Sequence, residues 1–321
     1  MHPISRRQFL PHLCFAAAAG GALLEGVPRA LGAEAPARKL TICLVCGNIG
    51  VSANQTQAID LAQKYGFESV EAHAEYLAGL EPDALAGLLA GMKEKRLVFG
   101  ATGLPVEFRQ DDARFEAGMK GLPRLAAGLE RAGVTRAGTW LSPAHRSLTY
   151  LENFRLHASR LREAAKVLKA HGLRLGLEYV GTRNLRTSQK YPFIHTMKEM
   201  RELIAEIGTG NVGLVLDSWH WWMAGDTEQD ISALWPEDVV AVDLNDAPAG
   251  VPMDQQVDGR RELPLATSVI DVGSFLNALN RIGYDGPVRA EPFNKPLNDL
   301  DNDAACAATA AAMKRAIALI R

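Results

Sequence analysis

The sequence predicts an α/β protein: a single (β/α)8 or TIM barrel, with eight parallel strands closed into one sheet. After about residue 38, short apolar runs rich in β-forming residues alternate with longer stretches that have helical spacing. The apolar runs are nearly continuous, as expected for parallel strands that are buried on both faces. A glycine also precedes several of these runs, at the place where the residue that ends a helix belongs.

The elements follow one another as strand and helix. In chain order, the candidate strands are residues 40–46, 69–73, 97–101, 137–141, 174–179, 212–217, 239–244 and 287–291. The candidate helices are residues 54–65, 82–95, 111–132, 151–171, 196–208, 226–235, 272–282 and 301–320. Eight such units fill residues 36–321 and indicate one domain. An open, doubly wound sheet would alternate in the same way but would not require this number of units.

Residues 1–35 have the pattern of an export signal of the twin-arginine type. Arg6 and Arg7 precede Phe9, an apolar stretch covers residues 13–24, and small residues dominate 30–35. We therefore expect a periplasmic or otherwise exported protein that contacts the twin-arginine export machinery only transiently. No later run approaches about 18 apolar residues, so we expect no stable membrane anchor.

The charge balance and the cysteines exclude some classes of function. The formal net charge is −2, and the sequence has no run of Lys and Arg, which disfavours a nucleic-acid partner. Cys43 and Cys46 lie three residues apart in one predicted strand, so their side chains point to opposite faces. No second C-x-x-C motif exists to complete a zinc site, which favours buried, inert thiols.

Four successive predicted strands end in a carboxylate: Glu178, Asp217, Asp243 and Glu291. In a (β/α)8 barrel the carboxyl ends of the strands carry the active site. Burying carboxylates costs several kcal/mol unless they are paired or bound to a cation, and Lys and Arg are scarce at these ends. The cluster therefore predicts a divalent cation, with oxygen-rich sites suiting Mg²⁺ or Mn²⁺ and mixed nitrogen and oxygen sites suiting zinc or cobalt.

Three further residues are weaker candidates for contact with a substrate. Glu71 and His73 share one face of the second predicted strand, because residues two apart do so. His73 is as well explained as a core histidine with satisfied hydrogen bonds. Trp140 ends the fourth predicted strand and could stack on a ring of the substrate, although aromatic residues are also ordinary core.

Four segments resemble a known family: Leu-Glu-Tyr at 177–179, the stretch 212–221 with its Asp-x-x-His, the stretch 242–248, and Gly-Pro-Val-Arg-Ala-Glu-Pro-Phe at 286–293. Residues 40–320 resemble the xylose isomerase-like barrel superfamily, which includes sugar epimerases, inosose dehydratase and AP endonuclease. The order and the spacing of the segments carry the resemblance more than any one motif does.

The resemblance implies a set of roles. Glu178 and Glu291 would bind one metal ion, Asp217 would be a third ligand, and His220 would touch the substrate or support the metal. Asp243 stands where the family usually has a histidine, so either it binds a harder metal, with Mn²⁺ or Mg²⁺ favoured over Co²⁺ or Zn²⁺, or the metal is lost. Arg261 precedes Leu-Pro at 263–264, in a loop like the family segment whose arginine often reaches substrate oxygens.

The predicted function is a metal-dependent isomerase or epimerase of a non-phosphorylated keto-sugar, with Glu178 and Glu291 moving a proton through an enediolate. A lyase or dehydratase that eliminates a hydroxyl from a 3-keto-glycoside or an inosose-like substrate is the main alternative. A nuclease of the AP endonuclease type and a non-catalytic carbohydrate-binding barrel are weaker ones. Homo-oligomerisation stays open.

Overall fold

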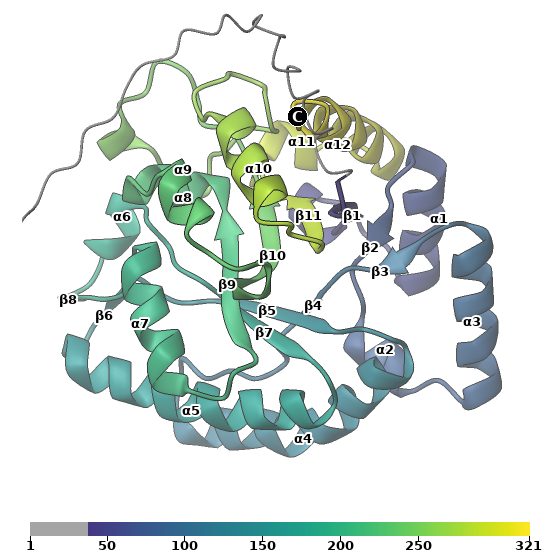
Figure 1. Cartoon of the computed structure of the whole chain (residues 1–321), viewed down its shortest axis with the longest axis horizontal. Helices are drawn as coiled ribbons and strands as arrows, with labels where there is room; N and C mark the ends of the chain where they lie inside the picture. Colours follow the sequence, from purple (N-terminus) through teal and green to yellow (C-terminus); the bar gives the residue numbers. More distant parts are fainter. Residues whose placement is uncertain (1–37) are drawn as a thin grey trace, which may run out of the picture. The chain divides into compact units, whose positions relative to one another are not determined.

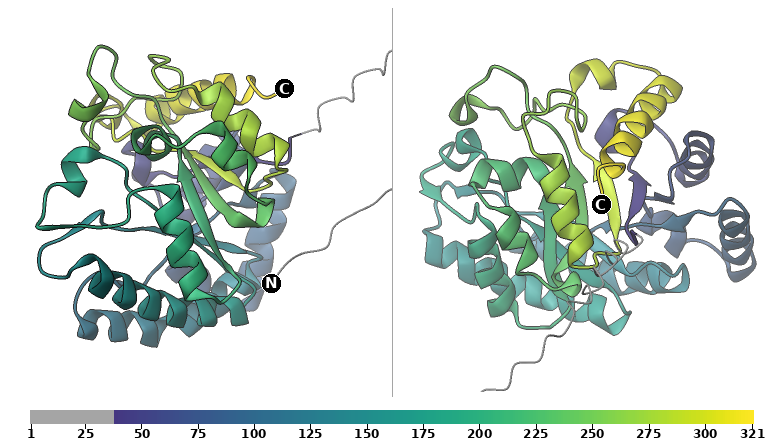
Figure 2. Two further views of the ribbon diagram at one scale, coloured as in Figure 1. Left: turned by 60° about the vertical axis from the view of Figure 1, so that its left-hand side comes forward. Right: turned by 45° about the horizontal axis from the view of Figure 1, so that its top comes forward.

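A parallel sheet ringed by helices forms the centre of the molecule (Figure 1, Figure 2). The computed structural model describes residues 38–321, so the predicted export signal at 1–35 lies outside the described residues. In the described part of the chain, no helix combines the length and the apolar composition that crossing a membrane requires.

Every strand of the central sheet is parallel to its neighbours. The strands are β1 (Thr41–Leu44), β2 (Ser69–Val70), β3 (Val98–Phe99), β4 (Thr102–Gly103), β5 (Arg136–Trp140), β7 (Arg174–Glu178), β9 (Val212–Asp217), β10 (Val239–Leu244) and β11 (Pro287–Ala290). They lie in the order β3-β2-β1-β11-β10-β9-β7-β5-β4. All eight predicted apolar runs thus contribute to the sheet, and the barrel-type alternation is confirmed.

The sheet differs from the predicted closed ring of eight strands. It has nine strands, and its two ends, β3 and β4, both come from one stretch of chain around the predicted strand 97–101. A Cβ placed on Gly100 would lie 2.7 Å from Cys43 Sγ and 3.1 Å from Pro287 Cβ. β3 pairs with β2 whereas β4 pairs with β5, and the N–H of Gly100 between them still donates to Val70 O on the β2 side at 2.9 Å. The chain runs through both strands, but the hydrogen-bonded ladder is open between them.

The eight predicted helices all form. They are α1 (Gln55–Tyr65), α3 (Pro82–Glu94), α4 (Asp112–Arg131), α5 (Tyr150–Ala170), α7 (Met197–Ile207), α9 (Glu228–Ser232), α10 (Val272–Arg281) and α12 (Asn302–Ile317). Local chemistry sets their ends: Asn54 and Thr196 form capping boxes at the starts of α1 and α7. Gly66 and Gly208 end the same helices with φ values of 71° and 67°.

Short elements that the sequence pattern did not predict lie mainly in the loops after the strands. They include α2 (Ala74–Ala78), α6 (Arg183–Arg186), α8 (Ser218–Ala224), the 3-10 turn η3 (Met253–Gln255), α11 (Lys295–Asn298), and the strands β6 (Ala144–His145) and β8 (Tyr191–Pro192). β6 and β8 pair antiparallel, apart from the main sheet and close to the start of α5 (Figure 1).

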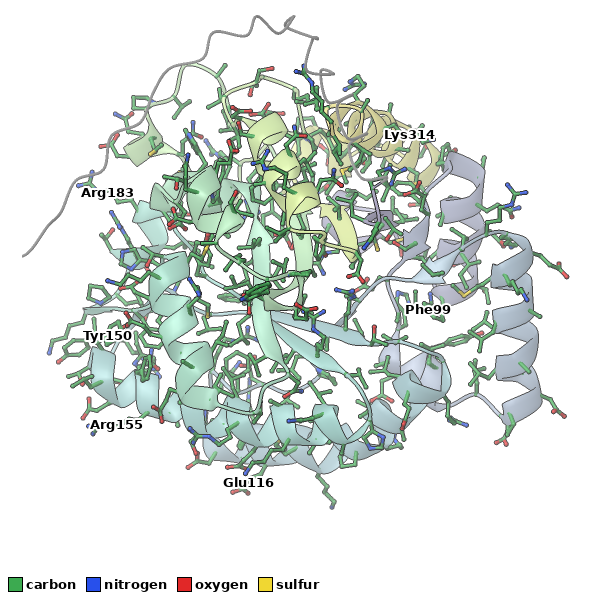
Figure 3. All side chains as sticks on the ribbon, in the orientation of Figure 1. Phe99, Glu116, Tyr150, Arg155, Arg183 and Lys314 are labelled. Carbon is green, nitrogen blue, oxygen red and sulfur yellow. The ribbon has the colours of Figure 1, made fainter. Side chains whose placement is uncertain are left out.

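The hydrophobic core lies mainly between the sheet and its helices, where side chains fill the space (Figure 3). Inside the sheet the buried apolar residues are small, namely Ala101, Val215 and Ala241. Cys43, Cys46 and Cys306 are free and buried, as predicted, and burial raises the pKa of the Cys43 thiol to about 12.

Candidate active site

The parallel register brings the predicted acidic residues to one end of the sheet. Asp217 pairs with Asp243 across β9 and β10, and Asp243 pairs with Arg289 across β10 and β11. Side chains of residues paired in register point to the same side of a sheet. We call the group formed by Glu178, Asp217, His220, Asp243, Arg261 and Glu291 the strand-end site. Apart from Glu291, which is half-buried, these residues are buried.

Arg261 lies at the centre of the strand-end site, and its side chain is only 1% exposed. Its Nη1 donates to Asp217 Oδ2 at 2.7 Å and to Glu291 Oε2 at 3.1 Å. Its Nη2 donates to Asp258 Oδ1 at 2.9 Å. A single guanidinium therefore joins three carboxylates; burial lowers its pKa, but the charges of these carboxylates outweigh burial and raise the pKa above its usual value.

A second guanidinium enters from β11. Arg289 Nε donates to Asp243 Oδ1 at 2.8 Å, and Arg289 Nη2 donates to Asp243 Oδ2. The expectation that salt bridges could not help to neutralise these strand ends was therefore wrong. Arg289 stands two residues before Glu291, and Arg261 reaches the site from the loop after β10.

Asp217 is anchored from three directions. Besides Arg261, the backbone N–H of Trp219 donates to its Oδ1 at 2.7 Å, and Asn245 Nδ2 donates to the same oxygen at 2.9 Å. Asn245 Oδ1 in turn accepts from the backbone N–H of Glu291 at 3.0 Å. Asn245 therefore links the end of β9 to the end of β11, through the carboxylate of Asp217 and the backbone of Glu291.

Three carboxyl groups of the site hold protons more strongly than usual. Burial raises the pKa of Glu178 well above its ordinary value, and the charge of Glu291 adds to the effect. Burial and Asp243 raise the pKa of Glu291 to about 8, and burial raises that of Asp217 to about 6. Glu178 Oε1 is buried and has no hydrogen-bond partner among the described residues. The site therefore has the proton-exchanging groups that acid–base chemistry at neutral pH requires.

His220 is a neutral imidazole between two donors. Burial, reinforced by Arg261, lowers its pKa to about 3. The backbone N–H of Gly181 approaches its Nδ1 at 3.3 Å, and Arg261 Nη2 approaches its Nε2 at 3.2 Å. A neutral imidazole has only one acceptor nitrogen, so only one of these contacts is a hydrogen bond.

The donor set fits a divalent cation. Glu178, Asp217 and His220 offer ligand atoms within 4.8 Å of one another, as do Glu178, Asp243 and Glu291. Five carboxylates gather here, counting Asp258, against two guanidinium groups, and Glu178 Oε1 lacks a partner. Asp243 is the poorest ligand of the five because Arg289 binds both of its oxygens. Its role as a ligand stays a prediction.

The weaker candidates lie around this centre. Glu71 and His73 are half-buried, with 4.0 Å between Glu71 Oε2 and His73 Nε2, and burial raises the pKa of Glu71. Trp140 pairs in register with Glu178 and is 47% exposed. Arg109 stacks over its indole ring, 4.5 Å from the centroid. Trp140 is thus free to contact a ligand, whereas Trp219 is core.

Sequence reasoning missed several residues that shape the site. The position of Arg289 could have been predicted from the sequence, because residues two apart in a strand, such as Arg289 and Glu291, share one face. Asp258 had no such signal, since its role depends on how the loop after β10 folds back. Asn245 stands directly after β10, and its role depends on contacts with the ends of β9 and β11. Asp246 holds that loop: its carboxylate accepts from the backbone N–H groups of Thr267, Ser268, Val269 and Ile270.

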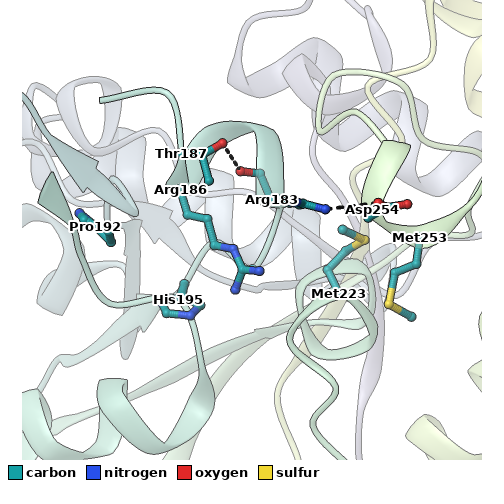
Figure 4. A pocket seen from close by; sticks show the side chains of 9 residues that line it. Arg183, Arg186, Thr187, Pro192, His195, Met223, Met253 and Asp254 are labelled. Atoms are coloured by element: carbon teal, nitrogen blue, oxygen red, sulfur yellow. Dashed lines mark hydrogen bonds and ion pairs between the residues drawn. The ribbon is translucent and has the colours of Figure 1, made fainter. Parts of the chain in front are cut away.

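A cavity lies next to the strand-end site, because Gly181 lines it and the N–H of Gly181 approaches His220 Nδ1; Figure 4 shows side chains that line this cavity. It has a volume of about 700 Å³, and α6, α8 and η3 contribute to its wall. Arg183 donates to Asp254 across it at 3.0 Å, and the side chains of Met223 and Met253 line it. None of the predicted catalytic residues lines this cavity, so volume alone does not locate the chemistry.

The fold and the acidic strand ends together define a (β/α)-barrel protein with a site of the cation-binding type. Residues 59–319 match the family model "Xylose isomerase-like TIM barrel". The chain belongs to this family.

Known proteins resemble this chain over most of its length. The structure of a xylose isomerase domain protein from Alicyclobacillus acidocaldarius is 30% identical in sequence, covers 87% of this chain and 99% of its own, and has a TM-score of 0.76. An inosose isomerase of Bacillus velezensis is 22% identical over 248 residues, which are 75% of this chain and 84% of that protein.

A third similar protein has a known structure that contains a metal ion. The IOLI protein, whose crystal structure has a bound zinc atom, is 19% identical, covers 87% of this chain and 98% of its own, and has a TM-score of 0.71. At this identity the likeness shows the fold alone. In this chain, the observation that fits a divalent metal is its own cluster of carboxylates and a histidine.

Proposed function

We propose that this chain is an exported, metal-dependent isomerase or epimerase of a non-phosphorylated keto-sugar or sugar derivative. The observation that carries the proposal is the pair of acidic groups Glu178 and Glu291, which both have raised pKa values and belong to one candidate cation site. The family and the inosose isomerase relative support a sugar as the substrate.

The two carboxyl groups have complementary tasks. Burial raises the pKa of both groups, and the charge of Glu291 adds to the effect on Glu178, so one group can donate a proton while the other accepts one from a carbon beside a carbonyl. Glu291 is our candidate base, and Arg261 and Asn245 set the position of its side chain and backbone. Return of the proton to another face or position gives epimerisation or isomerisation.

Glu178 would hold the metal with Asp217 and His220 or with Asp243 and Glu291, the two sets whose ligand atoms lie within 4.8 Å of one another. When bound, the metal supplies positive charge that polarises the substrate's carbonyl and hydroxyl oxygens. Trp140 would stack on the sugar, and Glu71 and His73, which follow β2, would be polar contacts. Asp217 keeps its orientation through Trp219 N–H and Asn245 irrespective of the metal.

Two further parts of the proposal rest on the sequence. The twin-arginine pattern at 1–35 supports export, and phosphorylated sugars are scarce outside the cytoplasm. The strand-end loops have no glycine-rich phosphate cradle, which also favours a free sugar. We propose no nucleic-acid partner and no stable membrane anchor.

The test is to incubate the metal-loaded protein in D₂O with a panel of free and 3-keto sugars and to follow the products by NMR. We expect an isomeric product with deuterium at the carbon that exchanges its proton. Glu291→Gln and Glu178→Gln should lower kcat by about 10²–10⁴-fold, whereas the control Asp254→Asn, in the neighbouring cavity, should not. An unsaturated product would identify a lyase instead. Unchanged turnover in Glu291→Gln would remove that residue from the mechanism.

A further inference from the structure

A second cavity, of about 600 Å³, lies over the first turns of α5. The β4–α4 loop, the β5–α5 loop and the segment before β8 enclose it. We call it the α5 pocket and define it by Arg109, Arg146, Asn153, His157 and Gln189. None of the strand-end residues lines it.

Two buried polar side chains of the α5 pocket each have one atom without a hydrogen-bond partner. Asn153 is 2% exposed and His157 is 3% exposed. Within the described residues, Asn153 Oδ1 and His157 Nε2 have no hydrogen-bond partner, although both atoms are fully buried. Leaving a buried polar atom unpaired costs about as much as a lost hydrogen bond, so such atoms usually face water or a ligand.

The tautomer of His157 follows from its other nitrogen. Nδ1 lies 2.9 Å from the backbone oxygen of Asn153, so Nδ1 carries the hydrogen and donates it. Burial lowers the pKa of His157 to about 4, which keeps the ring neutral. Nε2 therefore presents a lone pair and requires a donor from the ligand.

The ring of His157 is also fixed in place. It packs edge-on against Phe108, with ring centroids 5.5 Å apart, and lies 5.1 Å from Phe193. One turn further along α5, Arg160 Nη1 donates to the backbone oxygens of Phe108 and Gln110 at 2.7 and 2.6 Å. The loop that walls the pocket is thus tied to the same face of the helix.

A hydroxyl is the group that suits both atoms. It can donate to His157 Nε2, and it can donate to or accept from the Asn153 amide whichever way that amide is turned. Arg146 and Gln189 at the wall add further donors and an acceptor. Within residues 38–321, Arg146 forms no ion pair. A compound with several hydroxyl groups can satisfy such a mixture of donors and acceptors.

The α5 pocket also adjoins the strand-end site. Arg109 lines the pocket, stacks on the Trp140 ring, and donates from Nη1 to the Trp140 backbone oxygen at 3.0 Å. Trp140 pairs in register with Glu178. We propose that the α5 pocket is a second binding site for a polyhydroxylated molecule, a sugar or polyol, held by Asn153 and His157. This site does not depend on the chemistry at the strand ends.

The test is a calorimetric titration with D-glucose, D-xylose, sorbitol and gluconate, in the background Glu291→Gln so that no turnover occurs. We expect at least one of them to bind, and Asn153→Leu and His157→Phe each to weaken binding about 10-fold, the loss of one hydrogen bond to a buried partner. The matched control is Asn280→Leu, because Asn280 on α10 also has a buried, unpartnered amide atom but lies outside the pocket. That variant should bind as the background does.

A crystal structure of the wild-type chain soaked with the tightest binder makes the test independent of how the variants fold. We expect a ligand hydroxyl within hydrogen-bond distance of His157 Nε2 and of the Asn153 amide. Water alone at these atoms would overturn the proposal, as would equal affinity in all variants or no binding by any compound. Because Glu291→Gln lacks the proposed base, these outcomes do not depend on whether the sugar isomerase proposal holds.

Discussion

The strand-end site and the α5 pocket both bury polar side chains, but they satisfy them in opposite ways. At the strand ends, guanidinium groups neutralise part of the acidity: Arg261 binds Asp217 and Glu291, and Arg289 binds Asp243. In the α5 pocket two neutral side chains each leave one buried atom without a hydrogen-bond partner among the described residues, namely Asn153 Oδ1 and His157 Nε2. Removing any one charge from a buried network leaves its partners unpaired, which is costly. The neutral atoms without partners can still form a hydrogen bond with a ligand.

The largest expected effect on stability comes from removing the guanidinium of Arg261 at the centre of the strand-end site. Arg261→Leu would leave Asp217, Glu291 and Asp258 without their shared guanidinium and should lower the free energy of unfolding by about 3–5 kcal/mol. Urea denaturation measures it. Arg183→Leu is the control, because its pair with Asp254 is exposed and should contribute about 0–1 kcal/mol. Similar losses in both variants would show that the network is no more coupled than a surface pair.

The second prediction concerns how the stability of the protein depends on pH through His157 in the α5 pocket. The folded-state pKa of His157 is about 4, below the usual value of 6.5, so the unfolded chain binds a proton first as the pH falls. Stability should therefore be complete above about pH 6.5 and should decline towards pH 4, by about 3 kcal/mol from this group. Denaturation curves of the wild type and His157→Phe at several pH values should diverge in this window. Parallel curves would contradict it.

The third prediction separates the two regions by their response to metal. At a concentration of 100 times Kd, Mn²⁺ or another divalent ion should stabilise the wild type by about 2.7 kcal/mol. Glu178→Gln, which removes a group common to both candidate ligand sets, should lose most of this gain, whereas Asn153→Leu should keep it. Thermal unfolding with and without metal measures both. An undiminished gain in Glu178→Gln would place the ion elsewhere.

The smallest predicted effect concerns the contact that joins the two regions. A double-mutant cycle of Arg109→Ala and Trp140→Ala should give a coupling energy of about 0.5–1 kcal/mol, the usual size for a guanidinium stacked on an exposed ring. Denaturation of the four proteins provides it. A coupling near zero would mean that the pocket and the strand-end site are energetically separate.

The sequence by itself determined the alternation of strands and helices and the position of four acidic residues at one end of the sheet. These depend on local patterns: apolar runs form β7, β9, β10 and β11, and Glu178, Asp217, Asp243 and Glu291 stand at their carboxyl ends. Parallel pairing then requires the four side chains to converge, whatever the loops do.

Only the tertiary structure decided how that acidity is balanced. Arg261 and Asp258 enter from the loop after β10, which Asp246 holds through backbone contacts more than 20 residues away. The separation of β3 from β4 likewise depends on their pairing with β2 and with β5, and the α5 pocket depends on three separate loops. Such contacts join residues far apart in the chain, and a pattern of period two or 3.6 has no information about them.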